Sequence, residues 1–572
     1  MTFVRVLPDV PAINREFDYS VPERWSDAVQ VGSMVRIPLH GRRVAGWVTA
    51  VDVEPPSGVR VVPLAKISGI GPDAAMIDLC RWAAWRWAGR AATFLGTASP
   101  LQMVGRLPQP PRREPGPEPE VGAIEWLARP RTVLRLPPAE DTLPFVLAGW
   151  SRGDTLVVCP SIGSATGLAR RLRSERIPVA MYPDEWSRAA AGGCVVVGAR
   201  AAAFAPMPAL ASVVVIDEQD EALQNEGSPT WHAREVALER ARRAQVPALM
   251  TSPCPSLESV RRSPLVVESR SEERAGWPVT RVIDRRDEDR GRSGLYSEQL
   301  VRALRVDATV VCVLNRAGRA QLLACSTCRE LTRCETCGAA VHQERPGELS
   351  CRRCGAVRPV ICQACGATRL KNLRQGITRA REELEALLRE PVVELSGATR
   401  RADVPRARVY VGTEAVLHQV SGAAVVAFLE FDQELLAPRY RAAEQALGLL
   451  ARAARLVGGR GDGGLLVIQT RLPEHEVIRA AVHADPAIVM DAERQRRELT
   501  RFPPAVTMAF VGGEAAPEYI LRFGAPIGVD VLERDGSWLL VADERRTLLD
   551  ALAATERPSG RLRLQIDPMR LS

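Results

Sequence analysis

Eight of the thirteen cysteines lie in one short stretch, and this array constrains the fold more than any other feature of the 572-residue chain. They form four CxxC pairs: Cys325/Cys328, Cys334/Cys337, Cys351/Cys354 and Cys362/Cys365. A CxxC knuckle directs two thiolates at one ion, and two knuckles complete a tetrahedral zinc site with four sulfur ligands. The array therefore predicts a small insert that folds around two zinc ions.

The spacing of the pairs suggests which knuckles share an ion. Successive pairs are separated by 5, 13 and 7 residues, and the 13-residue gap resembles the loop of a zinc ribbon. We therefore expect a nested arrangement, in which the inner ion is bound by Cys334, Cys337, Cys351 and Cys354 and the outer ion by Cys325, Cys328, Cys362 and Cys365. Closed sites of four cysteines leave no open position for catalysis, so this role is structural.

Two other cysteine chemistries compete with zinc. Disulfide bonds are one, but the N-terminal sequence MTFVRVLPDVP has no secretory pattern, which favours reduced thiols. Iron–sulfur ligation is the weaker alternative, because no cluster-type spacing is present. The five remaining cysteines lie in apolar surroundings typical of a protein core.

Composition excludes two classes of protein. Hydrophobic residues make up 46% of the chain and charged residues 25%, which excludes a wholly disordered chain. The most apolar stretch, 201–216, contains two prolines and is too short to span a bilayer. The net charge of +8 permits nucleic acid as a partner without requiring it. We expect a cytoplasmic protein.

The pattern of apolar runs divides the chain into several units. Short runs between turns predict a β-rich domain over 1–107, and a Pro-rich linker follows over 108–130. Near-continuous β-branched runs alternate with helices over 131–262, and again over 263–320 with 373–500, which predicts two parallel sheets covered on both faces. The cysteine insert occupies 321–372, and 501–572 is predicted as an α+β domain. The fold class is multidomain α/β.

An acidic pair and a shortage of lysine bear on nucleotide chemistry. Asp217 and Glu218 follow an apolar strand in VVVIDEQD, as carboxylates do when they orient Mg²⁺ and water, although strands often end in acidic turns. The only lysines are Lys66 and Lys371, and neither precedes Ser or Thr. The chain therefore has no intact P-loop.

The order of these segments resembles the PriA family, the primosomal replication-restart DNA helicases (primosomal protein N′). The matching motifs are FDY at 17–19, VRIP at 35–38, the DEQD strand within 198–220, WHAREVALERA at 231–241, SPCPSLES at 252–259, LNRAGRA at 314–320 and VGT at 411–413. The cysteine array lies between the last two motifs, and the family nests its two zinc sites. The resemblance covers nearly the whole chain. It implies a β-rich N-terminal DNA-binding domain, two RecA-like helicase lobes with a double zinc-binding insert, and an α+β C-terminal domain.

The departures from the family concern its nucleotide contacts. Where the family has GxTGSGKTEVY, this chain reads TVLRLPPAEDTLPFVLAGWSRGD, without a glycine-rich loop or a lysine. The family's arginine motif QVAGRAGR aligns with 452–459, which places Leu456 and Gly459 at the arginine positions. An arginine finger alone is worth roughly 10³- to 10⁵-fold in rate. We therefore expect a degenerate helicase without useful ATP turnover, in which Asp217 and Glu218 are vestigial; retained Mg²⁺ binding by this pair is the alternative.

The resemblance also implies a DNA-binding set. In the family the first domain binds the 3′-hydroxyl end of the nascent strand, and the matching positions here are Phe17, Asp18, Tyr19, Gly41 and Lys66. Aromatic faces stack on a terminal base, and a carboxylate accepts a hydrogen bond from a free hydroxyl while repelling a 3′-phosphate. Trp231 matches an aromatic-rich loop that links single-stranded DNA to the lobes. The competing interpretation makes Phe17, Tyr19 and Trp231 packing residues.

These inferences predict a replication-restart primosome protein. It would recognise stalled or abandoned forks, bind branched and single-stranded DNA and the nascent 3′ end, and promote reloading of the replicative helicase without unwinding DNA. The resemblance further implies primosome proteins and single-stranded DNA-binding protein as partners, a nucleoid-associated monomer and no membrane. An active ATP-dependent 3′-to-5′ helicase with an unusual nucleotide site is the alternative, and a zinc-ribbon scaffold that binds protein alone is a third hypothesis.

Overall fold

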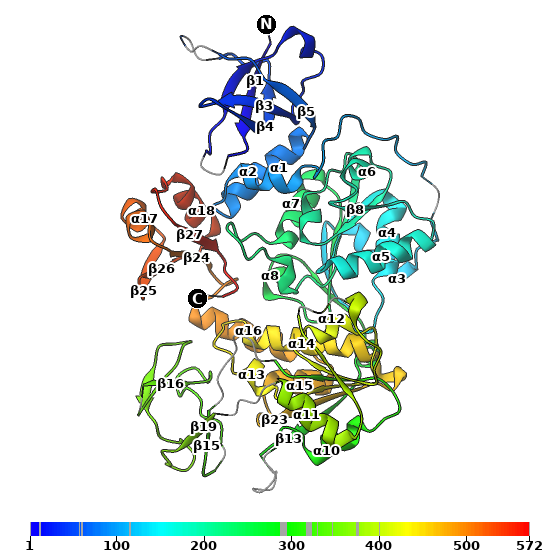
Figure 1. The fold of residues 1–572 in the computed structure, drawn as a ribbon, viewed down its shortest axis with the longest axis vertical. Coiled ribbons are helices and arrows are strands. Elements are labelled where there is room, and N and C mark those ends of the chain that lie inside the picture. The colour runs from blue at the N-terminus through cyan, green and yellow to red at the C-terminus, as the bar shows by residue number, and fades with distance from the viewer. Residues whose placement is uncertain are drawn as a thin grey trace.

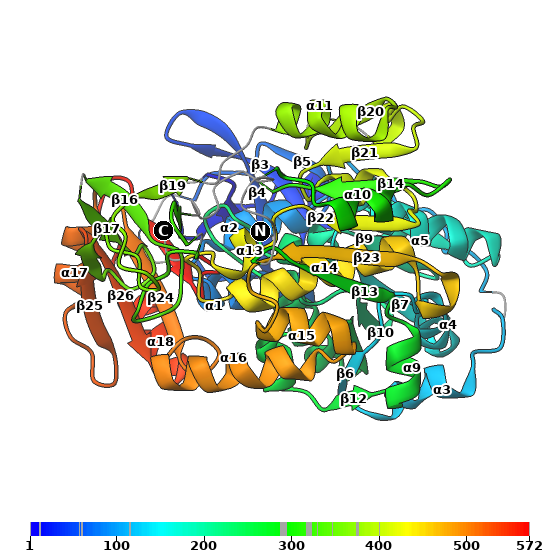
Figure 2. The same cartoon turned by 90° about the horizontal axis from the view of Figure 1, so that it is seen from below.

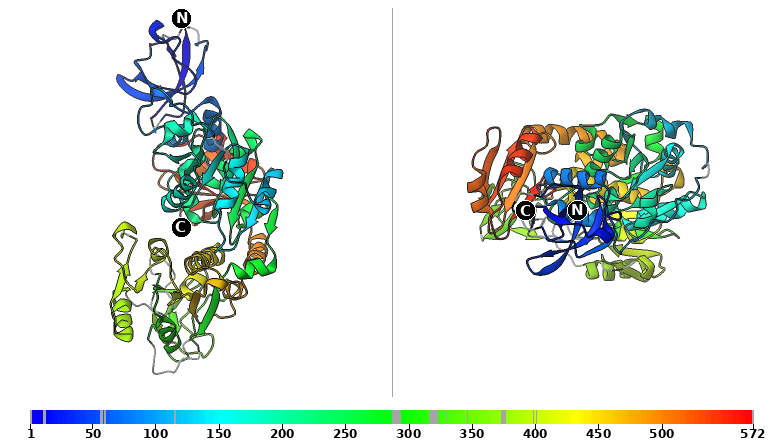
Figure 3. Two further views of the ribbon diagram at one scale, coloured as in Figure 1. Left: turned by 90° about the vertical axis from the view of Figure 1, so that its right-hand side faces the viewer. Right: turned by 90° about the horizontal axis from the view of Figure 1, so that it is seen from above.

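The computed structural model describes residues 2–10, 13–55, 58, 61–113, 116–286, 294–315, 323–328, 330–345, 347–372, 377–397, 399 and 401–570. The LNRAGRA segment lies almost entirely outside these residues. The described part forms an elongated molecule with an N-terminal sheet at one end and a second α/β lobe at the other (Figures 1 and 3). Within that part, no helix has the length and apolar character needed to cross a membrane.

The N-terminal sheet has the strand order β2-β1-β4-β3-β5, and all its pairs are antiparallel. Its strands are β1 (Phe3–Pro8), β2 (Phe17–Ser20), β3 (Ser33–Leu39), β4 (Arg42–Val51) and β5 (Lys66–Ile70). Val4 and Val6 on β1 are fully buried, whereas Arg5 between them points outward, the alternation expected of a strand with one covered face. Helices α1 (Ala74–Arg86) and α2 (Ala91–Ala98) follow the sheet.

The first α/β lobe contains a seven-stranded parallel sheet of order β12-β6-β11-β10-β7-β9-β8. Its strands are β6 (Arg131–Arg135), β7 (Asp154–Val158), β8 (Val179–Tyr182), β9 (Val195–Gly198), β10 (Leu210–Val215), β11 (Ala248–Ser252) and β12 (Leu265–Val267). The helices of this part of the chain are α3 (Val121–Ile124), α4 (Leu143–Arg152), α5 (Ile162–Ser174), α6 (Trp186–Ala191), α7 (Ala233–Ala244), α8 (Leu257–Val260) and α9 (Arg270–Ala275). Strands β7, β9 and β11 are buried along their whole length, as the continuous apolar runs predict.

The second lobe contains a six-stranded parallel sheet of order β13-β23-β22-β14-β21-β20. Its strands are β13 (Val279–Asp284), β14 (Val310–Val313), β20 (Val392–Leu395), β21 (Val409–Gly412), β22 (Val425–Phe428) and β23 (Leu465–Thr470). Its helices are α10 (Glu298–Leu304), α11 (Ile377–Leu388), α12 (Val416–Gln419), α13 (Asp432–Leu435), α14 (Ala442–Val457), α15 (Glu476–His483) and α16 (Ala487–Thr500). Helices α14 and α16 face α8 of the first lobe (Figure 1).

Two smaller units complete the chain. The cysteine insert contains β15 (Leu323–Cys325), β16 (His342–Arg345), β17 (Glu348–Ser350), β18 (Val357–Pro359) and β19 (Leu370–Asn372). The C-terminal unit has an antiparallel sheet of order β25-β26-β24-β27, built from β24 (Thr507–Gly512), β25 (Asp530–Arg534), β26 (Ser537–Ala542) and β27 (Arg563–Ile566), with α17 (Ala516–Phe523) and α18 (Arg545–Ala554). Both units lie on the same side of the molecule (Figure 2). The predicted multidomain α/β fold, with a β-rich N-terminal domain, two parallel-sheet lobes, a cysteine insert and an α+β C-terminal unit, is confirmed.

The segment predicted as a linker, 108–130, lies against the first lobe. The Arg113 guanidinium stacks on the Trp150 ring at 4.5 Å from the ring centroid. Trp126, within the same segment, is only 4% exposed and packs under the lobe's sheet. These contacts hold the segment in place between the N-terminal sheet and the lobe.

Candidate functional site

The eight cysteines of the insert gather into two groups of four. Cys325, Cys328, Cys362 and Cys365 form one group, and Cys334, Cys337, Cys351 and Cys354 form the other, with the sulfur atoms of each group within 4.8 Å of one another. The nested pairing predicted from the 13-residue gap is therefore confirmed. The closest sulfur pairs are 3.5 Å apart, well beyond the roughly 2.05 Å of a disulfide. Four convergent thiols suit a tetrahedral metal ion such as zinc.

The local sequence explains how the knuckles form. Gly338, Gly355 and Gly366 each follow the second cysteine of a pair, and each adopts a positive φ of 71° to 77°. Their N–H groups donate to the carbonyl of the first cysteine of the pair at 2.9 Å. Glycine takes this left-handed conformation without a side-chain clash, so the turn closes tightly and both thiols point inward. Burial raises the pKa of the Cys325 thiol, but backbone N–H donors outweigh it and lower the pKa to about 6.

The insert is attached to the second lobe through a short contact. The Ala340 N–H donates to the Leu436 carbonyl at 3.0 Å. The Leu436 side chain, 4% exposed, packs against Ala324, Leu331 and Ala340 of the insert. Leu436 directly follows α13, so the metal-binding unit and this helix of the lobe share one contact surface.

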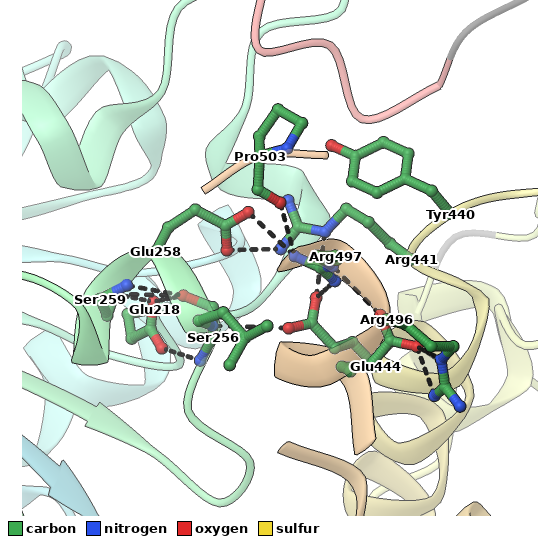
Figure 4. A network of polar contacts seen from close by, with 12 residues as sticks. Glu218, Ser256, Glu258, Ser259, Tyr440, Arg441, Glu444, Arg496, Arg497 and Pro503 are labelled. Carbon is green, nitrogen blue, oxygen red and sulfur yellow. Dashed lines mark hydrogen bonds and ion pairs between the residues drawn. The ribbon is translucent and has the colours of Figure 1, made fainter. Parts of the chain in front are cut away.

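A second candidate site lies between the two lobes, where the acidic pair ends strand β10. Glu218 is fully buried and accepts a hydrogen bond from the Arg234 guanidinium at 2.6 Å. It also accepts one from the Ser256 N–H at 2.7 Å (Figure 4). The hydroxyls of Ser256 and Ser259 also donate to its carboxylate, at 2.8 and 2.5 Å. All these donors come from within the first lobe. Glu218 is thus fully occupied in holding α8 and α7 to the end of β10.

Asp217 points across the cleft instead. Both of its oxygens accept from the Arg455 guanidinium on α14, at 2.5 and 2.8 Å. Arg452, one turn earlier on the same helix, donates to Asp220 at 2.8 Å. The Asp217 charge is the main cause that raises the pKa of Arg455. A cavity of about 260 Å³ remains beside these pairs, and its lining includes Glu414, His418 and Arg441.

The turn of the first lobe that faces this cleft has a composition unsuited to binding phosphate. Between β6 and α4, where a P-loop would lie, the chain reads LPPAED. Pro137 and Pro138 lack the backbone N–H groups that a phosphate-binding nest uses. The Pro138 carbonyl instead accepts a hydrogen bond from Arg455 at 3.1 Å.

The N-terminal sheet brings several of the predicted DNA-binding residues together. Backbone bonds from Ser20 to Val62 and from Leu64 to Ser20 close β2 onto the segment that leads into Lys66. The Tyr19 hydroxyl donates to the Pro38 carbonyl at 3.2 Å, close to the hairpin at Gly41. Gly41 has a φ of 76° with open space where a side chain would lie, and Lys66 is exposed. Tyr19 itself is only 3% exposed, so its ring is part of the core.

Asp18 has a partner that the sequence did not reveal. Arg5 lies directly opposite it on β1, and its guanidinium donates to both carboxylate oxygens at 2.8 and 3.2 Å. The Asp18 side chain is 10% exposed and that of Arg5 is 41% exposed. Beside them, Arg15 covers the half-buried Phe17 ring at 4.7 Å. The Asp18 carboxylate at the predicted 3′-end pocket therefore lies beside an accessible positive charge, the guanidinium of Arg5.

Comparison with known proteins agrees with this arrangement. Residues 5–100 match a family model described as the 3′DNA-binding domain of PriA. "Probable replication restart protein PriA" of Mycobacterium leprae is 26% identical and covers 98% of this chain and 99% of its own length. The M. tuberculosis protein of the same name is 28% identical over 88% of this chain and 86% of its own length. "Replication restart protein PriA" of Bacillus subtilis is 27% identical over 55% of this chain and 43% of its own length.

The chain is therefore similar along nearly its whole length to replication restart proteins named PriA. Among solved structures, a DEAD box protein from Methanococcus jannaschii covers 63% of this chain and 87% of its own length, at 9% identity and a TM-score of 0.33.

Helix α14 presents two arginines to the cleft, at positions other than those aligned with the arginines of the family's motif. Leu456 and Gly459 had been placed at the family's arginine positions, but Leu456 packs into the lobe core and Gly459 lies against the Ala275 carbonyl. Arg452 and Arg455 have the same three-residue separation as the arginines of QVAGRAGR and face the cleft. Two arginines with the spacing of this motif therefore face the cleft, and carboxylates bind both of them.

The loop that carries Trp231 is packed inward. The indole ring is 5% exposed and makes edge-to-face contacts with Phe204 at 5.1 Å and Phe94 at 6.4 Å between ring centroids. Leu223, eight residues earlier, is fully buried. In this conformation neither residue offers a face on which a DNA base can stack, so the geometry fits the packing interpretation.

Proposed function

We propose that this chain is a replication-restart protein that recognises abandoned forks through branched DNA and the nascent 3′ end. The observation that carries the proposal is the match of residues 5–100 to a 3′DNA-binding domain, together with the closed sheet that places Asp18 and Tyr19 near the segment before Lys66. In this function the protein promotes reloading of the replicative helicase and acts with primosome proteins and single-stranded DNA-binding protein.

The test compares two forks that differ only at the nascent 3′ end. The Asp18 carboxylate accepts a hydrogen bond from a 3′-hydroxyl and repels a 3′-phosphate, so the hydroxyl fork should bind roughly tenfold more tightly. Asp18→Ala should weaken binding of the hydroxyl fork. Equal affinity of the wild-type chain for the two forks would contradict the assignment of the pocket, and no fork binding at moderate salt would favour the scaffold hypothesis.

We further propose that the chain does not unwind DNA. Hydrolysis needs a cation at the phosphates and a free carboxylate that orients Mg²⁺ and water. Here the turn after β6 has two prolines, Glu218 is bound by Arg234, and Asp217 is bound by Arg455. Purified, metal-loaded protein should show no DNA-stimulated ATP hydrolysis in a reaction in which fork binding is verified.

The alternative of an active helicase is favoured by one observation, the presence of Arg452 and Arg455 at the cleft. Released from Asp217 and Asp220, these arginines would point toward any nucleotide bound there. Clear ATP turnover that Arg455→Ala abolishes would establish this alternative. Turnover that the substitution does not change would indicate a contaminating ATPase.

The two cysteine groups are proposed to bind two zinc ions. Their all-sulfur composition and fourfold convergence are typical of structural zinc. Elemental analysis of purified protein should give two zinc ions per chain. Substantial iron with visible absorption would contradict this assignment.

A further inference from the structure

The facing surfaces of the two lobes carry a row of ion pairs. Helix α14 carries four charged residues at spacings of three, eight and three, which places them on one face of the helix: Arg441 at its N-cap, then Glu444, Arg452 and Arg455. Arg455 binds Asp217 and Arg452 binds Asp220, while Arg441 reaches Glu258 on α8 at 3.2 Å. Three ion pairs thus hold one side of the second lobe against the first lobe.

A buried arginine strengthens this interface (Figure 4). Arg497 on α16 is 2% exposed and contacts Glu258 of the first lobe at 3.3 Å and Glu444 of the second at 2.5 Å. Burial alone would raise the pKa of Glu444, but Arg497 and Arg441 outweigh it and lower the pKa to about 2. The guanidinium also donates to the Pro503 carbonyl at 3.2 Å. Charges this well buried keep their attraction because little solvent screens them.

The chemistry of the cleft indicates what sets the distance between the lobes. A ligand shifts a conformational equilibrium only as far as its affinities for the two states differ. In a nucleotide-driven pair of lobes the negative charge that draws the arginines inward belongs to phosphate. Here the negative charge belongs to Asp217 and Asp220, and it is always present.

We propose that these ion pairs latch the two lobes in one closed arrangement that requires no nucleotide and does not respond to it. The latch keeps the N-terminal sheet and the metal-binding insert at a fixed separation, at opposite ends of the molecule (Figure 1). With a fixed distance between these two units, the protein can recognise DNA that reaches both ends of the molecule.

The experiment measures hydrogen exchange by mass spectrometry on the full, metal-loaded chain, with and without millimolar ATP and Mg²⁺. In the wild type, exchange over 217–222, 252–260 and 441–457 should be slow and unchanged by ATP. The double variant Arg452→Gln/Arg455→Gln should exchange faster in these segments by roughly tenfold, because the lobes separate more often. Arg455→Lys keeps the positive charge but loses the two-point contact with Asp217, so it should give an intermediate rate.

Arg302→Gln provides the matched control, because Arg302 pairs with Glu298 on the exposed face of helix α10, far from the cleft. It should leave exchange at the cleft unchanged. If ATP slows exchange over α14 in the wild type, the lobes respond to nucleotide and the proposal is wrong. It is also wrong if the double variant, with unchanged exchange in β7 and β9, exchanges at the wild-type rate over 441–457. Fork binding is not part of this measurement, so failure of the proposed DNA function would leave the result intact.

Discussion

At the scale of single residues, the pairing of Arg5 with Asp18 predicts how the 3′-end pocket discriminates. Asp18→Asn removes the negative charge and leaves the Arg5 guanidinium, 41% exposed, without its counter-ion. A free guanidinium binds phosphate strongly. We therefore expect the variant to prefer forks that end in a 3′-phosphate, reversing the preference proposed for the wild type, as measured by competition between the two forks.

Two further variants isolate the cause of this reversal. Arg5→Ala/Asp18→Asn should bind both forks weakly and without preference, because neither charge remains. Asp27→Asn removes an exposed carboxylate from the same domain and should keep the wild-type preference. An Asp18→Asn variant that still prefers the 3′-hydroxyl would show that Arg5 does not face the DNA end.

Glu218 predicts a loss of stability on substitution. It is fully buried and is the charge partner of Arg234, which is itself only 4% exposed. Glu218→Gln leaves the Arg234 charge buried and unpaired, which should lower the free energy of unfolding by about 3 kcal/mol. Glu175→Gln, on the exposed end of α5, should have no measurable effect. Equal thermal midpoints for the two variants would show that Glu218 has no structural role.

At the scale of elements, the cysteine insert depends on its metal ions. Its five strands are only three or four residues long, and such a small unit rarely folds without a bound metal ion or a disulfide. Removal of metal by a strong chelator should unfold residues 323–372 and loosen α13, because Leu436 loses its contact with the insert. Hydrogen exchange should rise in these segments while β10 and β11 stay protected. Protection of the insert after complete metal removal would contradict this prediction.

Much of the element scale could be predicted from the sequence because the signals are local. The spacing of the cysteines determines which thiols meet, since a knuckle needs only four residues and a tight turn. Continuous β-branched runs predicted the two parallel sheets, because strands covered on both faces have no polar side. These patterns need no knowledge of what lies far away in the chain.

The contacts between distant elements could not be predicted in the same way. Arg5 meets Asp18 only because of the register between β1 and β2, which no local pattern specifies. Arg452 and Arg455 meet Asp220 and Asp217 only because α14 packs across the cleft, which no local pattern specifies. The burial of Trp231 depends on Phe94 from another unit.

At the scale of the whole molecule, one buried charge cluster joins three units. Glu235 on α7 accepts from Arg86 of α1 at 2.9 Å and from Arg545 of the C-terminal unit at 3.3 Å. Arg86 also contacts Asp567 at 3.0 Å. Burial raises the pKa of Glu235, but Arg86 and Arg545 outweigh it, so the pKa lies well below 4.5. The stabilisation is therefore present above pH 4.5 and is lost as the pH falls through the folded pKa.

Glu235→Gln tests whether this cluster holds the DNA-binding sheet in position. The variant leaves Arg86 and Arg545 short of a counter-charge, so it should be less stable by about 3 kcal/mol and lack the acid-dependent loss. Hydrogen exchange should rise in α1 and α18, and affinity should fall for forks while a short single strand with a 3′-hydroxyl binds normally. Glu239→Gln is the matched control, because Glu239 pairs with Arg242 and Arg243 of its own helix and joins no other unit in the described part of the chain. If both variants bind forks equally well, the three units do not need a fixed arrangement to recognise DNA.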